Sequence, residues 1–289
     1  MSFWRRAAEG RDSVGRSQPV FAARQIGAVR YYSIPWFAPE RGVTAAFSTR
    51  LGGRSRGVFA TLNLGLHVGD DPEAVLANRA RFCASLGLDP RHLVACAQVH
   101  GNEVAVVGAL DRGRGAFDHA SSVPGTDGLV TTTPGVPLIT FYGDCVPLFL
   151  FDPVKRAIAL VHAGWRGTLG RIAARALAVL QEHCGTAPAT VLAAIGPAIG
   201  PCCYAIGADL AVRFAREFPG GALVRRGADG AWRLDLWTAN RRILLEAGVK
   251  AGHIAVARRC TACAADEFFS HRSSGGKTGR MAAILMLDG

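Results

Sequence analysis

Short apolar runs alternate with segments of helical pattern along most of this chain, and this alternation most constrains its fold. The apolar runs have the length of buried strands and lie at 43–49, 104–107, 138–141, 148–151, 157–161, 190–195, 254–257 and 283–287. The helical segments lie among them, at about 71–86, 168–183, 208–217 and 236–247. Strands grouped in the middle of a chain with helices around them predict an α+β (mixed α/β) fold, with mixed β-sheets flanked by helices.

The helix expected at 71–86 has the clearest end signals. Asp71 is a favourable N-cap residue, Pro72 suits the first turn, and Glu73 is favoured by the positive end of the helix dipole. Gly87 is expected to end the helix, because glycine readily adopts the left-handed conformation that follows a last turn.

The composition predicts one large globular domain without disulfides. The chain has 289 residues, of which 49% are hydrophobic, so it can bury a core without covalent staples. Its eight cysteines are spread over a chain too long for a small disulfide scaffold, and reduced thiols are the better interpretation. We expect a single domain over residues 31–289, preceded by a flexible N-terminal extension over residues 1–30.

Two features argue against export and against a membrane. Arg5, Arg6 and Glu9 interrupt the N-terminus, which therefore lacks the apolar core of a secretory signal. The longest apolar stretch, 136–151, contains Asp144 and two prolines, and it is shorter than the roughly 20 apolar residues of a spanning helix. We expect a cytoplasmic protein with no membrane partner.

The charge pattern argues against a nucleic-acid partner. The formal net charge is +11, but only three of the 33 basic residues are lysines, and the arginines are scattered. No run of five basic residues and no basic stretch interleaved with aromatic residues occurs. A diffuse positive potential instead suits a small anionic substrate or phosphate.

Three short segments each place one potential metal ligand near the end of an expected strand. These segments are 98–101, 143–147 and 161–167. They contain His100, Cys145 and His162. One thiolate and two imidazoles suit a tetrahedral Zn²⁺ whose fourth position is left to water or substrate. Copper is a competing metal for the same donors.

Three other interpretations of these residues stay open. In the first, a buried cysteine simply lies beside two hydrogen-bonded histidines. In the second, Cys145 and His162 form the nucleophile and base of a Cys–His hydrolase. In the third, a non-catalytic protein holds a structural zinc, and a fourth ligand such as His67 or Cys202 closes the site.

Eight strings in the sequence resemble the YfiH/YlmD family. They are FSTRLGG, LNLGLHVGDDP, QVHGNEV, TDGLV, GDCVPLFLFDP, VHAGWRGT, IGPAIGPCCY and FFSHR. They occur in order from about residue 44 to residue 287, which leaves residues 1 to about 30 outside the resemblance. The family has been labelled multicopper polyphenol oxidase or laccase-domain protein, and later recognised as zinc-dependent purine nucleoside enzymes. The resemblance implies a catalytic domain whose fold is like that of the cytotoxic-necrotizing-factor cysteine hydrolases.

The resemblance also implies an activity and a metal site. It implies phosphorolysis of adenosine, inosine, guanosine and methylthioadenosine with inorganic phosphate, and deamination of adenosine to inosine. The family holds its metal with the histidine of QVHG, the cysteine of DCVP and the histidine of VHAGW. By motif these ligands are His100, Cys145 and His162, so we expect a zinc enzyme acting on purine nucleosides. We expect a monomer.

Both reactions need polar groups placed around a nucleoside. Zinc supplies an activated water for deamination, whereas phosphorolysis needs cations that hold phosphate. Guanidinium groups bind phosphate in a bidentate manner, so Arg50 and Arg166 are candidate phosphate ligands, although each also fits a structural role. Asn63 is a candidate for contacting ribose or base, and turn chemistry explains it equally well. The expected catalytic residues are Cys145, His162 and Arg50.

Phenol oxidation by copper, which the older family label implies, is the alternative function. A multicopper oxidase needs many more histidines than the eight dispersed ones in this chain, in which no His-x-His pair occurs. A Cys–His hydrolase remains a further alternative.

Two neighbours of the expected ligands have more than one interpretation. Asp144 either orients a histidine ligand or acts as a general acid or base, or it faces away, because adjacent strand residues point to opposite faces. Trp165 either stacks on a base or packs in the core.

Three further signals are interpreted as structural features or as incomplete motifs. Cys260 and Cys263 have metal-ligand spacing but no second pair close by in the sequence. The vicinal pair Cys202 and Cys203 lies in a turn and is expected to pack. The string at 276–278 ends like a P-loop but lacks the earlier glycine of that motif.

The remaining residues of note lie in turns. His67 is expected in a turn. His271 is a candidate site residue, but a role as a hydrogen-bonded structural residue is the favoured interpretation. Ala205 stands where the family commonly has glutamate, and this difference puts in doubt any activity for which that glutamate is needed.

Overall fold

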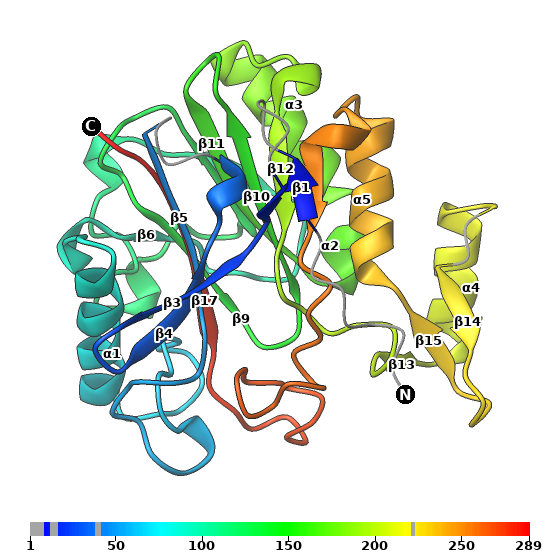
Figure 1. Cartoon of the computed structure of the whole chain (residues 1–289), viewed down its shortest axis with the longest axis horizontal. Helices are drawn as coiled ribbons and strands as arrows, with labels where there is room; N and C mark the ends of the chain where they lie inside the picture. The colour runs from blue at the N-terminus through cyan, green and yellow to red at the C-terminus, as the bar shows by residue number, and fades with distance from the viewer. Residues whose placement is uncertain (1–8, 12–16, 38–41, 221–222) are drawn as a thin grey trace.

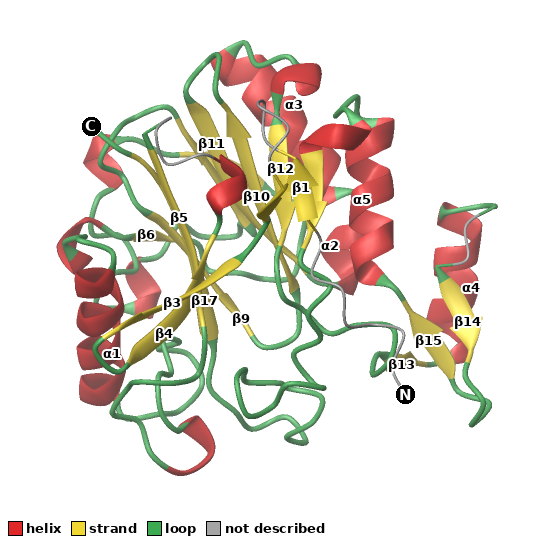
Figure 2. Ribbon diagram, in the orientation of Figure 1, coloured by secondary structure: helices red, strands yellow, loops and turns green. Residues whose placement is uncertain are grey.

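The computed structural model describes residues 9–11, 17–37, 42–220 and 223–289. Two six-stranded sheets share one apolar core, and helices cover the outer face of each sheet (Figure 1, Figure 2). Each sheet contains both parallel and antiparallel pairs, so the expected mixed α/β fold with mixed sheets is confirmed. No described helix is both long and apolar enough to cross a membrane.

The first sheet has the strand order β16-β12-β10-β11-β8-β7. The pairs β7–β8 and β12–β16 are parallel, and the others are antiparallel. Its strands are β7 (Val104–Val106), β8 (Gly128–Thr131), β10 (Val146–Asp152), β11 (Ala157–Ala163), β12 (Leu192–Ile195) and β16 (Ile254–Val256).

The second sheet has the strand order β3-β4-β5-β17-β9-β6, with β6–β9 its one parallel pair among the described residues. Its strands are β3 (Ala22–Ile26), β4 (Val29–Ser33), β5 (Val43–Ser48), β6 (Val94–Ala95), β9 (Leu138–Tyr142) and β17 (Met281–Leu287). A separate pair joins β1 (Glu9–Arg11) to β2 (Ser17–Pro19).

The central strands β10 and β11 are buried on both faces. In β10, Leu148 and Leu150 face the helices on the outer side, whereas Phe149 and Phe151 face the second sheet. Strand side chains alternate between faces, so a strand buried on both sides must be apolar at nearly every position. This explains why the sequence shows continuous apolar runs here instead of an alternating pattern.

Five helices lie in the described residues: α1 (Pro72–Ser85), α2 (Trp165–Leu169), α3 (Ile172–Cys184), α4 (Ala208–Glu217) and α5 (Leu236–Glu246). Helix α1 packs on the second sheet through Phe82, while α3 and α5 pack on the first sheet. Helix α4 lies at one edge of the molecule beside a small sheet of β13 (Ala205–Ile206), β14 (Val224–Arg226) and β15 (Trp232–Leu234), as Figure 1 shows.

The expected helix at 71–86 is confirmed, including its cap. The Asp71 side chain accepts a hydrogen bond from the backbone N–H of Glu73 at 3.1 Å. The single helix expected at 168–183 is wrong in one respect, because α2 and α3 are separate helices. Arg171 has a left-handed backbone with φ of 56°, which ends one helix and starts the next.

The N-terminal boundary falls within a β-hairpin. Strands β3 and β4 pair with each other, and β4 pairs with β5, so residues 22–30 belong to the second sheet rather than to a flexible extension. Residues 1–8 and 12–16 of the expected extension lie outside the described residues. The assignment of 31–289 to a single catalytic domain stays a prediction.

Candidate metal and substrate site

The three expected ligands come together at one end of the first sheet. His100 lies between β6 and β7, Cys145 lies in the turn between β9 and β10, and His162 lies in β11. One ligand atom from each residue lies within 4.8 Å of the others. The donor set that the sequence predicts is therefore a spatial cluster that could hold a metal ion. His162 is buried, Cys145 is partly buried and His100 is exposed.

The backbone around this cluster adopts unusual conformations. Gln98, His100 and Asp144 have φ values of 53°, 61° and 95°, in the left-handed region that residues with side chains rarely adopt. Left-handed conformations at residues other than glycine concentrate at functional sites. The strained turns deliver the side chains of residues 100 and 145 to the same place.

Asp127 orients two of the three ligands. Its Oδ1 atom lies 2.9 Å from Nδ1 of the His162 ring and accepts a hydrogen bond from the backbone N–H of His100, also at 2.9 Å. Its Oδ2 atom accepts from the Gly101 N–H at 2.7 Å. Asp127 is fully buried. By holding Nδ1 of His162, the carboxylate leaves the other ring nitrogen free for a metal ion or for the thiol.

The electrostatics of the cluster favour a thiolate. Burial alone would raise the pKa of Cys145, but His162 and His100 lower this pKa to about 6. Burial alone would lower the pKa of His162, but Cys145 and Asp127 raise it to about 9. The thiolate is the form of cysteine that binds metals and acts as a nucleophile.

Two glycines of the VHAGWRG string allow close approach. A Cβ atom at Gly164 would lie 3.1 Å from Cδ2 of His100 and 3.2 Å from Sγ of Cys145. A Cβ atom at Gly167 would lie 2.8 Å from the carbonyl oxygen of Gly101. These two glycines therefore let the start of α2 lie close against the cluster.

The cluster forms one wall of a pocket of about 420 Å³. Apolar side chains line much of the rest: Phe141, Trp165, Ile199, Tyr204 and Leu236. Three of the described lining residues are arginines: Arg166, Arg272 and Arg280. Asp144 is the one carboxylate among the described lining residues. A pocket with apolar walls and several cations suits a ligand that combines a ring with an anionic group.

Two of these three arginines lie against aromatic rings, and the third is partly buried. The guanidinium of Arg166 lies 4.5 Å from the Trp165 ring centre, and that of Arg272 lies 5.1 Å from the Tyr204 ring centre. Burial lowers the pKa of Arg280, although Cys145 and Asp144 act in the opposite direction.

Two expected site residues lie away from this pocket. The Arg50 guanidinium donates to the carbonyl oxygens of Ala60 and Ala265, at 2.8 Å and 2.7 Å, and is not among the lining residues. Asn63 is buried, and its Oδ1 accepts the backbone N–H of Arg280 at 2.8 Å. All of these partners are backbone groups of the chain. Both residues hold the chain segments that surround the pocket.

Asp144 has a different role from the orienting one considered for it. Its Oδ1 accepts a hydrogen bond from Thr261 Oγ1 at 2.6 Å, and its Oδ2 accepts from the Arg272 N–H at 2.7 Å. The carboxylate thus ties the segment after β16 to the turn that carries Cys145. The histidine-orienting carboxylate is Asp127, which the sequence reasoning missed, although the TDGLV string places it just before β8.

Three further residues line the pocket without a clear site signal in the sequence. The sequence offers His67 as a possible fourth zinc ligand and His271 as a site candidate but favours a structural role for each, and both line the pocket. Gln98 lines it as well, and its side chain is held by two hydrogen bonds to the backbone of Phe141, at 2.7 Å and 2.8 Å. Their positions depend on loops far apart in the sequence, so no local pattern indicates them.

The comparisons with known proteins agree with this geometry. A family model described as "multi-copper polyphenol oxidoreductase laccase" matches residues 44–288. The crystal structure of YlmD from Geobacillus stearothermophilus matches with a TM-score of 0.88 and 42% identity, covering 93% of this chain and 99% of that one. That of the hypothetical protein YfiH from Bacillus licheniformis matches with a TM-score of 0.86 and 36% identity, covering 92% and 99%.

The fold and the cluster define a mixed α/β protein with a Cys–His₂ centre in a pocket. This chain belongs to the YfiH/YlmD family, which the laccase model describes. A relative in G. stearothermophilus named purine nucleoside phosphorylase YlmD is 44% identical over 249 residues, which cover 86% of this chain and 91% of the relative. A protein named adenosine deaminase RL5, from an unknown prokaryotic organism, is 36% identical over 83% of this chain and 92% of its own length.

Proposed function

We propose that this chain is a zinc-dependent purine nucleoside phosphorylase that also deaminates adenosine. The observation that carries the proposal is the Cys–His₂ cluster in the wall of a pocket that also holds three arginines. The names of the relatives support the substrate class, because they include purine nucleoside phosphorylases and an adenosine deaminase. Adenosine, inosine, guanosine and methylthioadenosine are the proposed nucleosides, and inorganic phosphate is the second substrate.

The donor chemistry of the cluster fits zinc. One thiolate and two imidazole nitrogens are borderline-soft ligands, and three protein ligands are typical of a catalytic rather than a structural zinc. His100, Cys145 and His162 would hold the ion. When bound, zinc supplies Lewis-acid chemistry and a hydroxide near neutral pH.

The residues of the chain have separate tasks in this proposal. Asp127 fixes the tautomer of the His162 ring through its contact at 2.9 Å. Trp165 and Tyr204 line the pocket and are the proposed aromatic contacts of the purine base. Arg166 and Arg272 are the proposed phosphate ligands, because both line the pocket beside these rings.

Arg50 and Asn63 enter the proposal as positioning residues. Arg50 holds the segment at Ala265, and Asn63 holds the backbone of Arg280. In this role both residues act on the substrate only through other residues, whereas a catalytic role was expected for Arg50.

The experiment incubates the purified protein with inosine, with and without phosphate, and measures hypoxanthine and ribose 1-phosphate. A second assay measures inosine formed from adenosine. We expect hypoxanthine only with phosphate, and loss of both activities in Cys145→Ala. Cys184→Ala, which changes a cysteine at the end of α3 outside the lining residues, is the matched control. Hypoxanthine release without phosphate would instead indicate a hydrolase.

Copper-dependent phenol oxidation is the alternative, because the family description names it. The same preparations tested with Cu²⁺ and a phenol distinguish the two. Phenol turnover that requires Cys145, with no nucleoside turnover, would reject the phosphorylase proposal.

A further inference from the structure

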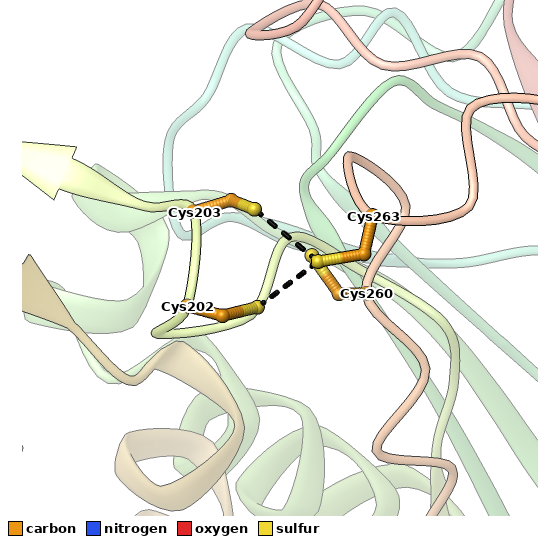
Figure 3. A group of neighbouring side chains, drawn as sticks. All are labelled: Cys202, Cys203, Cys260 and Cys263. Atoms are coloured by element: carbon orange, nitrogen blue, oxygen red, sulfur yellow. Dashed lines mark hydrogen bonds between the residues drawn. The ribbon is translucent and has the colours of Figure 1, made fainter. Parts of the chain in front are cut away.

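A second cluster of side chains that could hold a metal ion lies outside the pocket lining. Cys202 and Cys203 lie in the turn before β13, and Cys260 and Cys263 lie in the segment after β16. Figure 3 shows the four side chains pointing toward one another from these two segments. Each Sγ atom lies within 4.8 Å of the others. The sequence reasoning treated the pairs separately, because about 60 residues lie between them.

The sulfur geometry is that of four ligands around a common centre. Cys263 Sγ lies 3.4 Å from Cys202 Sγ and 3.4 Å from Cys203 Sγ. A tetrahedral ion with Zn–S bonds of about 2.3 Å separates its sulfur ligands by about 3.8 Å. A disulfide bond is much shorter, at about 2.05 Å, and all four cysteines are free.

Backbone hydrogen bonds join the two segments that carry the cysteines. The N–H of Ala198 donates to the carbonyl oxygen of Arg259 at 3.1 Å, and the N–H of Thr261 donates back to the carbonyl oxygen of Ala198 at 3.2 Å. Ala198 and Cys260 form an isolated parallel bridge. The cysteines are therefore presented by a fixed scaffold, and binding an ion would require little rearrangement.

A backbone donor supports negative charge on the cluster. The N–H of Gly200 donates to Cys260 Sγ at 3.2 Å. Such contacts to the ligand atoms orient a metal site and stabilise the thiolates. Gly200 also has no room for a side chain, because a Cβ atom there would lie 2.6 Å from the Trp237 ring and 3.1 Å from Cys202 Sγ.

We propose that Cys202, Cys203, Cys260 and Cys263 bind a second zinc ion as a closed, structural Cys₄ site. Cys260 and Cys263 have the Cys-x₂-Cys spacing typical of zinc sites, and four thiolates leave no position for a substrate. The Cys₄ site is thus chemically distinct from the Cys–His₂ cluster, which has three protein ligands.

The Cys₄ site joins two segments that form the pocket wall. Tyr204, a lining residue, directly follows Cys203. Thr261 lies between Cys260 and Cys263 and donates to Asp144, whose other oxygen holds the Arg272 N–H. An ion at the Cys₄ site would fix both segments relative to each other. A consequence for substrate affinity rests on the proposed function, whereas the site itself does not.

The test counts metal ions in the full-length protein, purified under reducing conditions without chelators from zinc-supplemented cells. Native and elemental mass spectrometry should give two zinc ions per wild-type chain and one in the double variant Cys260→Ser, Cys263→Ser. The single variant Cys145→Ala should also lose one ion, and Cys184→Ser should keep two. Equal zinc content in the wild type and the double variant would overturn the proposal.

A second measurement does not depend on the stability of the double variant. In Cys145→Ala, one equivalent of Co²⁺ should give the intense visible absorption of a four-thiolate site. A spectrum without that absorption overturns the proposal. So does a wild-type intact mass lowered by the loss of thiol hydrogens, which indicates disulfides, or the presence of iron and inorganic sulfide. These outcomes are independent of any nucleoside assay.

Discussion

The carboxylate of Asp127 lies 2.9 Å from Nδ1 of His162, and both side chains are buried. The same carboxylate accepts the backbone N–H of His100, so one residue orients two of the three donors of the Cys–His₂ cluster. Burial favours the neutral acid, but the hydrogen bond from His162 and its charge lower the pKa of Asp127. The carboxylate is therefore charged at neutral pH and strengthens the histidine as a ligand.

Asp127→Asn should weaken metal binding at the Cys–His₂ cluster by about 10–100-fold, because the amide carries no charge and orients the imidazole less well. A chelator competition titration measures the affinity. Asp118→Asn is the matched control, because that carboxylate also accepts two backbone N–H groups but caps a short surface helix. An unchanged affinity in Asp127→Asn would show that the carboxylate does not support the metal.

In the metal-free protein, Cys145 should react with iodoacetamide at low pH. Because its pKa is lowered to about 6, the reactive thiolate should persist down to about pH 6 and disappear as the pH falls further. Burial raises the pKa of Cys83 and of Cys96 to about 12, so both should stay unmodified. Alkylation at each cysteine is followed by peptide mass spectrometry. A midpoint near pH 9 for Cys145 would contradict the proposed thiolate.

Gly164→Ala should disturb the metal cluster without unfolding the chain. The added methyl group would contact His100 and Cys145 at 3.1–3.2 Å, and such overpacking costs about 1–3 kcal/mol, which corresponds to roughly 5- to 150-fold in affinity. Gly207→Ala is the control. Both glycines are helix N-caps with φ near −75° and −72°, but a Cβ atom at Gly207 meets nothing within 4 Å. Equal zinc affinity in the two variants would contradict the prediction.

Arg166→Ala should raise the KM for phosphate by about tenfold, if Arg166 holds that substrate as proposed. Steady-state rates at varied phosphate concentration provide the measurement. Arg213→Ala is the control, because its guanidinium lies 5.5 Å from the centre of the same Trp165 ring but Arg213 does not line the pocket. An equal increase in the KM for phosphate in both variants would show that the effect arises from the lost contact with Trp165 and not from a lost phosphate ligand.

The sequence predicts local features well and distant contacts poorly. The cap at Asp71 and the apolar runs at 148–151 and 157–161 carry their own signals, and the structure confirms the corresponding elements. The hairpin of β3 and β4 was missed, since β3 has no buried residue and therefore carries no alternating pattern of apolar and polar residues.

The Cys–His₂ cluster and the Cys₄ site show the same difference between local signals and distant contacts. His100, Cys145 and His162 were recognised because chemistry and family strings agree on them. The Cys₄ site was not, because the parallel bridge between Ala198 and Cys260, which brings Cys202 beside Cys260, is not indicated by the sequence. Asp127 was missed for a similar reason: its role depends on strand β8 lying next to β11.

The burial of β11 on both faces has a consequence for how the centre responds to ligands. His162 extends from a strand enclosed by apolar layers, so its amide hydrogen should be among the slowest to exchange with deuterated solvent. Arg272, by contrast, lies on an exposed loop, and its surroundings open at far lower free-energy cost. When a ligand binds, amide hydrogen exchange should therefore change in the loop that carries Arg272. Exchange in β11, which carries His162, should stay unchanged.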